Sequence, residues 1–327
     1  MPATEAQAEP VRLDAAGLGD SLRSMLPVVR EHENELNQLN VFPVRDHDTG
    51  TNMALTLEGV VKAVEATRGR PLRELSAAVI DAALLEARGN SGTILAEVLR
   101  GLFETWAPLR SVGPADLVHG FRAAAERADQ AVLEPVEGTI LTVVRATAEA
   151  LEARPEGDPA ALLAIAADAA GRAVEATRDQ LEVLRHAGVV DAAARGFELC
   201  LRAFAAAAAG QPSPGQPSPG QPGGVEARSP EAARPGHATG HVDDDDFRQA
   251  HTPAFEVQYL LETSEQDAEE LKRYLATIGD SIAVARSDGL YRVHVHTDHA
   301  GAAIEEAIRR GATSRIQVAY LREHAPD

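Results

Sequence analysis

Hydrophobic residues recur at helical spacing through the first two-thirds of the chain. After Asp48 they stand at Met53, Leu57, Val60 and Val64, every three or four positions. The same spacing continues through later segments that are rich in alanine and joined by short turns. Alanine favours helix and short turns favour antiparallel neighbours, so the pattern predicts an all-helical domain over residues 10–210.

The pattern changes near the C-terminal end of the sequence. Phe255, Val257 and Tyr259 alternate with polar residues, as in a strand with one buried face. The chain then alternates between the two periodicities, and the order strand-helix-strand-strand-helix-strand predicts a small split-βαβ domain over residues 251–327. The expected strands are 255–259, 281–285, 291–295 and 316–320, and the expected helices are 268–278 and 302–310.

Between these patterns lies a segment that cannot build a core. It contains the repeat Gln-Pro-Ser-Pro-Gly and an acidic run at Asp243–Asp246. This composition predicts a disordered linker over residues 211–250, with the acidic run as solvated linker. The fold class expected is therefore multidomain α+β.

Composition and charge limit the partners and the location that the protein can have. The 327 residues carry a formal net charge of −19, which disfavours nucleic acid and anionic membrane surfaces as partners. Cys200 is the single cysteine, so no disulfide can form within the chain. The sequence shows no signal peptide and no apolar run long enough for membrane insertion, and a cytoplasmic location is expected.

The segment Asn40-Val-Phe-Pro-Val-Arg-Asp46-His-Asp48-Thr-Gly-Thr-Asn-Met53 carries the clearest chemistry. Asp46 and Asp48 stand two residues apart, directly before a small, hydroxyl-rich turn and a helix. Carboxylates bind Mg²⁺, and the backbone N–H groups of a helix N-terminus bind phosphate. The alternative is an Asx-rich turn in which Thr49 or Thr51 caps the helix.

Three further turns offer similar groups at helix starts. They are Arg88-Gly-Asn90-Ser91-Gly92, Pro135-Val-Glu-Gly-Thr139 and Gly188-Val-Val-Asp191. Each alone is more typical of an ordinary inter-helix turn. Four such turns at the ends of helices in one domain suggest a shared site on one rim.

Together the motifs N-V-F-P-V-x-D-x-D-T-G-T-N-M, A-R-G-N-S-G-x-I-L, P-V-E-G-T-I-L-T-V and G-V-V-D-A resemble the DhaL-type ATP-binding domain of dihydroxyacetone (glycerone) kinases. The closer resemblance is to the ATP-binding subunits of fatty-acid kinases. The resemblance implies an eight-helix antiparallel barrel that binds ATP and Mg²⁺ at one end. It implies that Asp46 and Asp48 are the catalytic, Mg²⁺-binding residues and that Asn40 lies near a third metal position. The nucleotide-binding residues that it implies are Thr49, Gly50, Thr51, Asn52, Asn90, Ser91, Gly92, Thr139 and Asp191.

The chain departs from the family pattern at three places. His47 stands where the family has glycine, Arg45 replaces a usual proline, and Ala193 and Ala194 replace a glycine-rich stretch. A Cβ atom at residue 47 conflicts with phosphate if the backbone there needs a positive φ.

His294 and His296 stand two residues apart on one expected strand and so project from one face. With Glu256 from a neighbouring strand they suit Zn²⁺, and the alternative is a pair of surface histidines bonded to the helix layer. The resemblance extends to the fatty-acid kinase middle domain, in which the two histidines match zinc ligands. Glu256 then takes the place of a common cysteine ligand.

The resemblance implies an ATP-dependent kinase component that phosphorylates a fatty acid presented by a DegV-like acyl-binding protein. Two alternatives stay open, a glycerone-kinase-type phosphotransferase and a nucleotide-binding regulatory protein without turnover. A homodimer through the middle domain is also expected. The sequence ends where the middle domain should end and is expected to lack the family's third, partner-binding domain, as a naturally short form, a split gene or a truncated product.

Overall fold

The structure is a computed structural model that describes residues 12–211 and 253–321. The predicted linker over 211–250 lies almost wholly outside these described residues, so it stays a prediction, as do the domain boundaries drawn beside it. No helix in the described ranges combines the length and the apolar character needed to cross a membrane.

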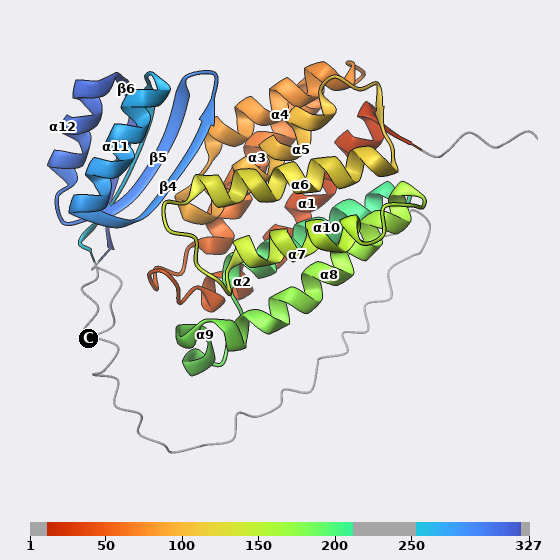
Figure 1. Ribbon diagram of the computed structural model, residues 1–327, viewed down its shortest axis with the longest axis horizontal. Helices are drawn as coiled ribbons and strands as arrows, with labels where there is room; N and C mark the ends of the chain where they lie inside the picture. The colour runs from red at the N-terminus through yellow and green to blue at the C-terminus, as the bar shows by residue number, and fades with distance from the viewer. Residues whose placement is uncertain (1–11, 212–252, 322–327) are drawn as a thin grey trace, which may run out of the picture.

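Eight long helices of the described residues form a closed ring, which Figure 1 shows from the side. Each packs against the next along the chain, and the last packs against the first, so the predicted eight-helix barrel is confirmed. The short helices α2 (Glu33–Leu39) and α9 (Glu182–Ala187) lie at the same end of the ring. The ring consists of α1 (Ala15–Glu31), α3 (Thr49–Ala66), α4 (Leu72–Glu86), α5 (Gly89–Trp106), α6 (Pro114–Ala131), α7 (Ile140–Glu152), α8 (Pro159–Gln180) and α10 (Ala192–Ala208).

The apolar faces of these helices fill the inside of the ring. Phe103 and Trp106 of α5 are fully buried, and the Trp106 indole N–H donates to the carbonyl of Asp116, 2.9 Å away. Gly101 brings α5 close to α6, because a Cβ atom at this position would lie 2.5 Å from the Cα of Ala124. The two-residue strand β1 (Leu13–Asp14), before α1, pairs with the two-residue strand β2 (Ser111–Val112), between α5 and α6.

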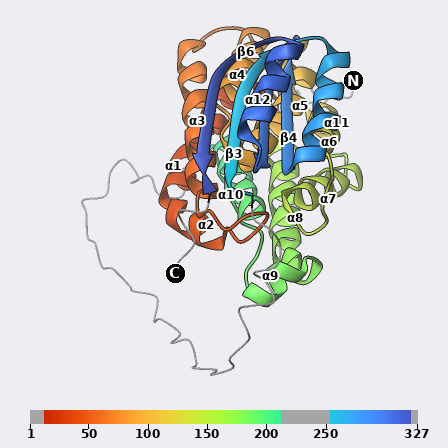
Figure 2. The ribbon, with the colours of Figure 1, turned by 90° about the vertical axis from the view of Figure 1, so that its left-hand side faces the viewer.

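The second domain has the predicted split-βαβ order. Its four strands form an antiparallel sheet in the order β4-β5-β3-β6. Helices α11 and α12 cover the face of the sheet that points away from the helical ring (Figures 1 and 2). The elements are β3 (Phe255–Glu262), α11 (Glu265–Ile278), β4 (Gly279–Ser287), β5 (Leu290–Thr297), α12 (Ala300–Arg310) and β6 (Ala312–Tyr320).

The other face of this sheet packs on the helical ring and is polar. Alternation puts Tyr291, Val293 and Val295 in the core beneath α11 and α12. The residues between them on β5, and their neighbours on β3, are almost fully buried as well. They are Glu256, Gln258, Arg292, His294 and His296. The alternative of two surface histidines is therefore wrong, because His294 and His296 are only 1% and 2% exposed.

Direct contacts hold the two domains together. The backbone N–H of Arg286 on β4 donates to Glu97 of α5 at 2.7 Å, and Arg315 of β6 donates to the carbonyl of Leu85 at 3.0 Å. The loop between α6 and α7 also joins the edge of the sheet, through a bridge between Val132 and Ala283. The nucleotide-site turn predicted after Pro135 thus begins beside the second domain.

Candidate active site

Three carboxylates converge at the end of the ring where the two domains meet. Asp46 and Asp48 come from the loop between α2 and α3, and Glu256 comes from β3 of the second domain. One oxygen from each lies within 4.8 Å of the others. Asn40, which ends α2, is buried, and its amide donates a hydrogen bond to Asp46. Asn40 therefore holds the carboxylate of Asp46 in place.

The electrostatics of this carboxylate cluster favour a bound cation. Burial, and after it the charge of Asp48, raises the pKa of Asp46 to about 8. Burial and the charge of Glu256 raise the pKa of Asp48. Three carboxylates this close repel one another unless they are protonated or neutralised. Since carboxylate oxygens are the ligands that Mg²⁺ takes, the residues present fit this ion.

Glu256 also belongs to a second group, with His294 and His296, whose ligand atoms lie within 4.8 Å of one another. Nδ1 of His294 is 3.8 Å from Glu256, and neither ring nitrogen of His294 has a hydrogen-bond partner in the described part of the chain. Burial lowers the pKa of both histidines to about 3, so both rings are neutral. Neutral imidazoles with free nitrogens fit Zn²⁺.

The start of α3 differs from the sequence prediction. The helix begins at Thr49, and neither Thr49 nor Thr51 caps it. Instead, Oδ1 of Asn37 accepts the N–H groups of Gly50 and Thr51, at 2.7 and 3.2 Å. The side chain of Thr51 donates to Glu33 at 2.8 Å. Gly50 and Thr51 thus anchor α3 to α2, and their N–H groups are occupied.

A cavity of about 430 Å³ opens beside the carboxylate cluster. Five predicted nucleotide-binding residues line it, from four separate turns: Thr49, Asn90, Ser91, Thr139 and Asp191. Its volume lies within the usual range for small-molecule sites. The four predicted turns therefore converge on one cavity.

Two further predicted residues, Asn52 and Gly92, bring α3 and α5 close together beside these turns. A Cβ atom on Gly92 would lie 2.4 Å from Oγ1 of Thr56, and one on Gly89 would lie 2.4 Å from the amide of Asn52. Gly89 also has a φ of 56°, which favours glycine. Asn52 and Gly92 thus set the close approach of α3 and α5.

Asp191 joins the starts of two helices. Its carboxylate accepts the N–H of Ala194 at 2.8 Å and caps α10, and a bond from the N–H of Ile140 ties it to α7. Burial raises the pKa of Asp191 to about 6. The side chain is thus a buried part of the cavity wall with structural bonds of its own.

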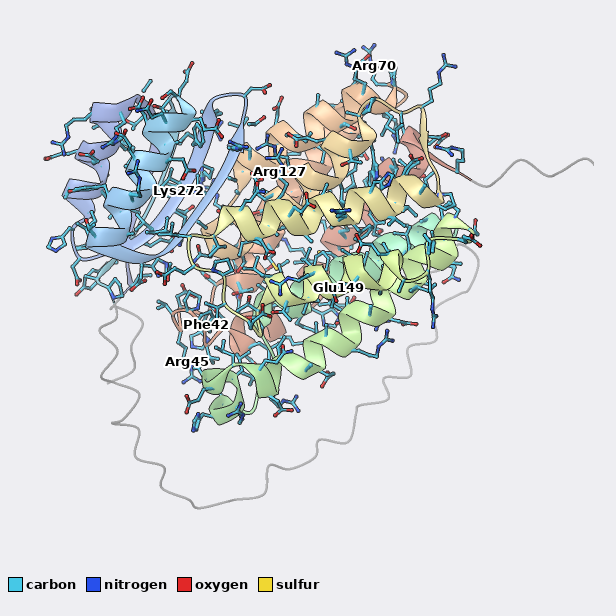
Figure 3. The ribbon with its side chains drawn as sticks, in the orientation of Figure 1. Phe42, Arg45, Arg70, Arg127, Glu149 and Lys272 are labelled. Carbon is cyan, nitrogen blue, oxygen red and sulfur yellow. The ribbon has the colours of Figure 1, made fainter. Side chains whose placement is uncertain are left out.

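The sequence did not predict the apolar wall of the cavity. One part comes from the helical domain, and Figure 3 shows Phe42 and Arg45 on the loop between α2 and α3. The other part comes from the second domain, at the end of α11 and the start of β4. The apolar lining residues include Phe42, Val44, Ile94, Val132, Leu133, Val136, Ile140, Leu141, Ala276 and Ile282. Only the contact between the domains identifies the last two.

Comparison with known proteins places the chain in a family. The model of the DAK2 domain matches residues 43–206, about half of the chain, which include all four turns. The chain belongs to the DAK2 domain family. A second model, which describes the middle domain of FakA-like fatty acid kinase proteins, matches residues 252–326.

Similar proteins occur in several bacteria. An uncharacterized protein of Staphylococcus saprophyticus is 29% identical over 89% of this chain and 52% of its own length. Protein YloV of Bacillus subtilis is 28% identical over 95% of this chain and 56% of its own. This chain thus spans about half the length of these relatives. A solved dihydroxyacetone kinase from C. freundii, in complex with AMP-PNP and Mg²⁺, is 18% identical, with a TM-score of 0.45 over 63% of this chain and 36% of its own.

Proposed function

We propose that this chain is the ATP- and Mg²⁺-dependent kinase part of a fatty-acid kinase. In this proposal it transfers the γ-phosphoryl group of ATP to a fatty-acid carboxylate that a DegV-like acyl-binding protein presents, and the product is an acyl phosphate. The observation that carries the proposal is the convergence of Asp46, Asp48 and Glu256 beside a cavity lined by the four predicted turns. The match of the second domain to a fatty acid kinase middle domain supports the acceptor.

Each part of the site has a task in this reaction. Asp46, Asp48 and Glu256 would hold Mg²⁺, which when bound offsets the negative charge of the nucleotide phosphates. The hydroxyls of Thr49 and Ser91 would donate hydrogen bonds to phosphate oxygens, and the Thr139 hydroxyl, which donates to the carbonyl of Val136 at 2.8 Å, holds its own turn in place. The apolar wall between Val132 and Ile140 suits the nucleotide base.

The second domain has two tasks in this account. It adds Glu256 to the carboxylate cluster, and it closes one side of the cavity with Ala276 and Ile282. Closure of the cavity excludes water from the phosphates, which strengthens the charge interactions there. The histidine pair would hold Zn²⁺ beside this site through neutral ring nitrogens.

Phosphoryl transfer from labelled ATP tests the proposal. The purified chain, Mg²⁺ and a DegV-like protein loaded with oleate are expected to give labelled acyl phosphate, trapped as the hydroxamate. Glycerone replaces the loaded protein in a parallel reaction. Label on glycerone instead would favour the glycerone-kinase alternative. Tight Mg²⁺-ATP binding with no transfer to either acceptor would favour a regulatory protein without turnover.

A further inference from the structure

Arg292 is a buried cation that the second domain points toward the helical ring. It lies on β5, on the same sheet face as His294 and Glu256, and only 1% of it is exposed. One of its nitrogens, Nη2, donates to the side-chain oxygen of Gln258 at 3.2 Å. Its Nε and Nη1 have no acceptor among the residues that the structure describes.

This guanidinium lies in surroundings that oppose its charge. It is almost fully buried, and the like charges of Arg88 and Arg315 lie near it. A buried charge with unmade hydrogen bonds destabilises a protein, and an apolar side chain of similar size usually replaces it without loss. A bound metal cannot meet the need either, because guanidinium N–H groups bond only to acceptors. The missing partner is therefore an oxygen acceptor, which is best satisfied by an oxyanion.

Arg292 is connected to the metal-site carboxylates. Gln258, which accepts from Arg292, donates through its own amide to Glu256, and Glu256 lies within 4.8 Å of Asp46 and Asp48. On the other side, Arg88 is the N-cap residue of α5, and Asn90 and Ser91 of the cavity follow in the first turn of that helix. Arg292 thus lies between the carboxylate cluster and a turn predicted to bind phosphate.

We propose that Arg292 is an oxyanion-binding residue of the active site, supplied by the second domain. Its ligand is the terminal phosphoryl group of the nucleotide or the carboxylate of the acceptor, both of which offer oxygens to a planar pair of N–H donors. The inference rests on the proposed function, since both ligands belong to that reaction. It gives the polar face of the sheet a part in catalysis beyond holding metal.

Calorimetry with three ligands tests this role in the full chain. Wild type, R292M and R292K are each titrated with Mg²⁺-ADP, with Mg²⁺-AMP-PNP and with sodium octanoate. R292M is expected to bind Mg²⁺-ADP as wild type does and to bind Mg²⁺-AMP-PNP about 10- to 100-fold more weakly, as for loss of a hydrogen bond to a charged group. If the carboxylate is the ligand, the loss appears with octanoate instead. R292K keeps the charge and loses the planar fork, so a partial loss is expected.

R315M is the matched control. Arg315 also contributes positive charge near Arg292 and also contacts the helical domain, but it already bonds to Leu85 and Glu86. R315M is therefore expected to discriminate between ADP and AMP-PNP as wild type does. Thermal unfolding of each variant separates a folding defect from a binding defect.

The outcomes separate this inference from the proposed function. If R292M binds all three ligands like wild type, or weakens all three equally together with its stability, the oxyanion role is wrong while the nucleotide site stands. If wild type binds none of the three ligands, both proposals fail.

Discussion

At the scale of the residue, His47 has a φ of 58° at the position where the related motif has glycine. Its ring nitrogen Nδ1 lies 3.0 Å from the carbonyl of Asn37, which ties the loop to α2. This conformation costs an ordinary residue about 1–2 kcal/mol. Histidine tolerates it better than a β-branched residue does.

Two substitutions at His47 test this backbone constraint. H47G relieves the strain, but it loses the Nδ1 contact and raises the conformational entropy of the unfolded chain. Because these effects oppose each other, we expect its free energy of unfolding to stay within about 1 kcal/mol of wild type. H47V adds a β-branched side chain at positive φ and should lose about 2 kcal/mol or more. Urea denaturation measures both. An H47V protein as stable as wild type would mean that the loop does not require this conformation.

Asp191 gives a pH-dependent prediction. Its pKa of about 6 in the folded protein lies above the value of about 3.9 expected for the unfolded chain. Its contribution to stability is therefore present below pH 4 and is lost as the pH rises through 6, at a cost of up to about 3 kcal/mol. D191N keeps an oxygen to cap α10 and removes the charge. We expect D191N to gain stability over wild type at pH 8 and little at pH 4.

Chemical denaturation of both proteins at the two pH values measures this difference. A stability difference that does not change with pH would show that the Asp191 carboxylate is not the group responsible. Nucleotide binding should weaken in D191N in either case if this wall of the cavity contacts the ligand.

At the scale of the element, the helical spacing predicted the barrel and the alternation predicted the small sheet, because both depend on local periodicity. The start of α3 was not predictable in the same way. Its cap is Asn37, which lies in another helix and reaches the N–H groups of Gly50 and Thr51 through the tertiary fold. Local sequence rules place a cap next to its helix, so they pointed to Thr49 or Thr51.

Two glycine-to-alanine substitutions test the close approach of α5 and α6. At Gly101 an added methyl group would lie 2.5 Å from Ala124, so G101A should cost about 1–3 kcal/mol of stability through overpacking. At Gly17 in α1 the nearest atoms lie at an ordinary 3.6 Å, so G17A should gain up to about 1 kcal/mol from helix propensity. Thermal denaturation compares them. Equal effects would show that α5 and α6 do not pack this closely.

At the scale of the whole molecule, the sequence motifs predicted most polar residues of the site. They did not predict the contact between the two domains. Strand alternation says which residues share a face, and it does not say whether water or another domain covers that face. The alternative of two surface histidines at His294 and His296 stayed open for this reason. The sequence between the domains has no hydrophobic periodicity from which the docking of the second domain on the helical domain could be predicted.

The docked arrangement predicts that Ala276 of α11 affects nucleotide binding. This residue is exposed and lines the cavity. A276W should leave stability unchanged and weaken ATP binding about tenfold or more by filling the cavity mouth. T277W is the control, because Thr277 is the next exposed residue and does not line the cavity. Calorimetry with Mg²⁺-ATP compares the two, and equal affinities would argue against domain docking at the cavity.

The central claim is that Asp46 and Asp48 make nucleotide binding dependent on Mg²⁺. The most direct measurement is calorimetric titration of ATP, with and without Mg²⁺, into wild type and into the double variant D46A/D48A. We expect wild type to bind ATP tightly only with Mg²⁺. The double variant should lose that binding while keeping its helical circular dichroism, since removing two repelling carboxylates does not destabilise the fold. Unchanged ATP affinity in the double variant would contradict the site.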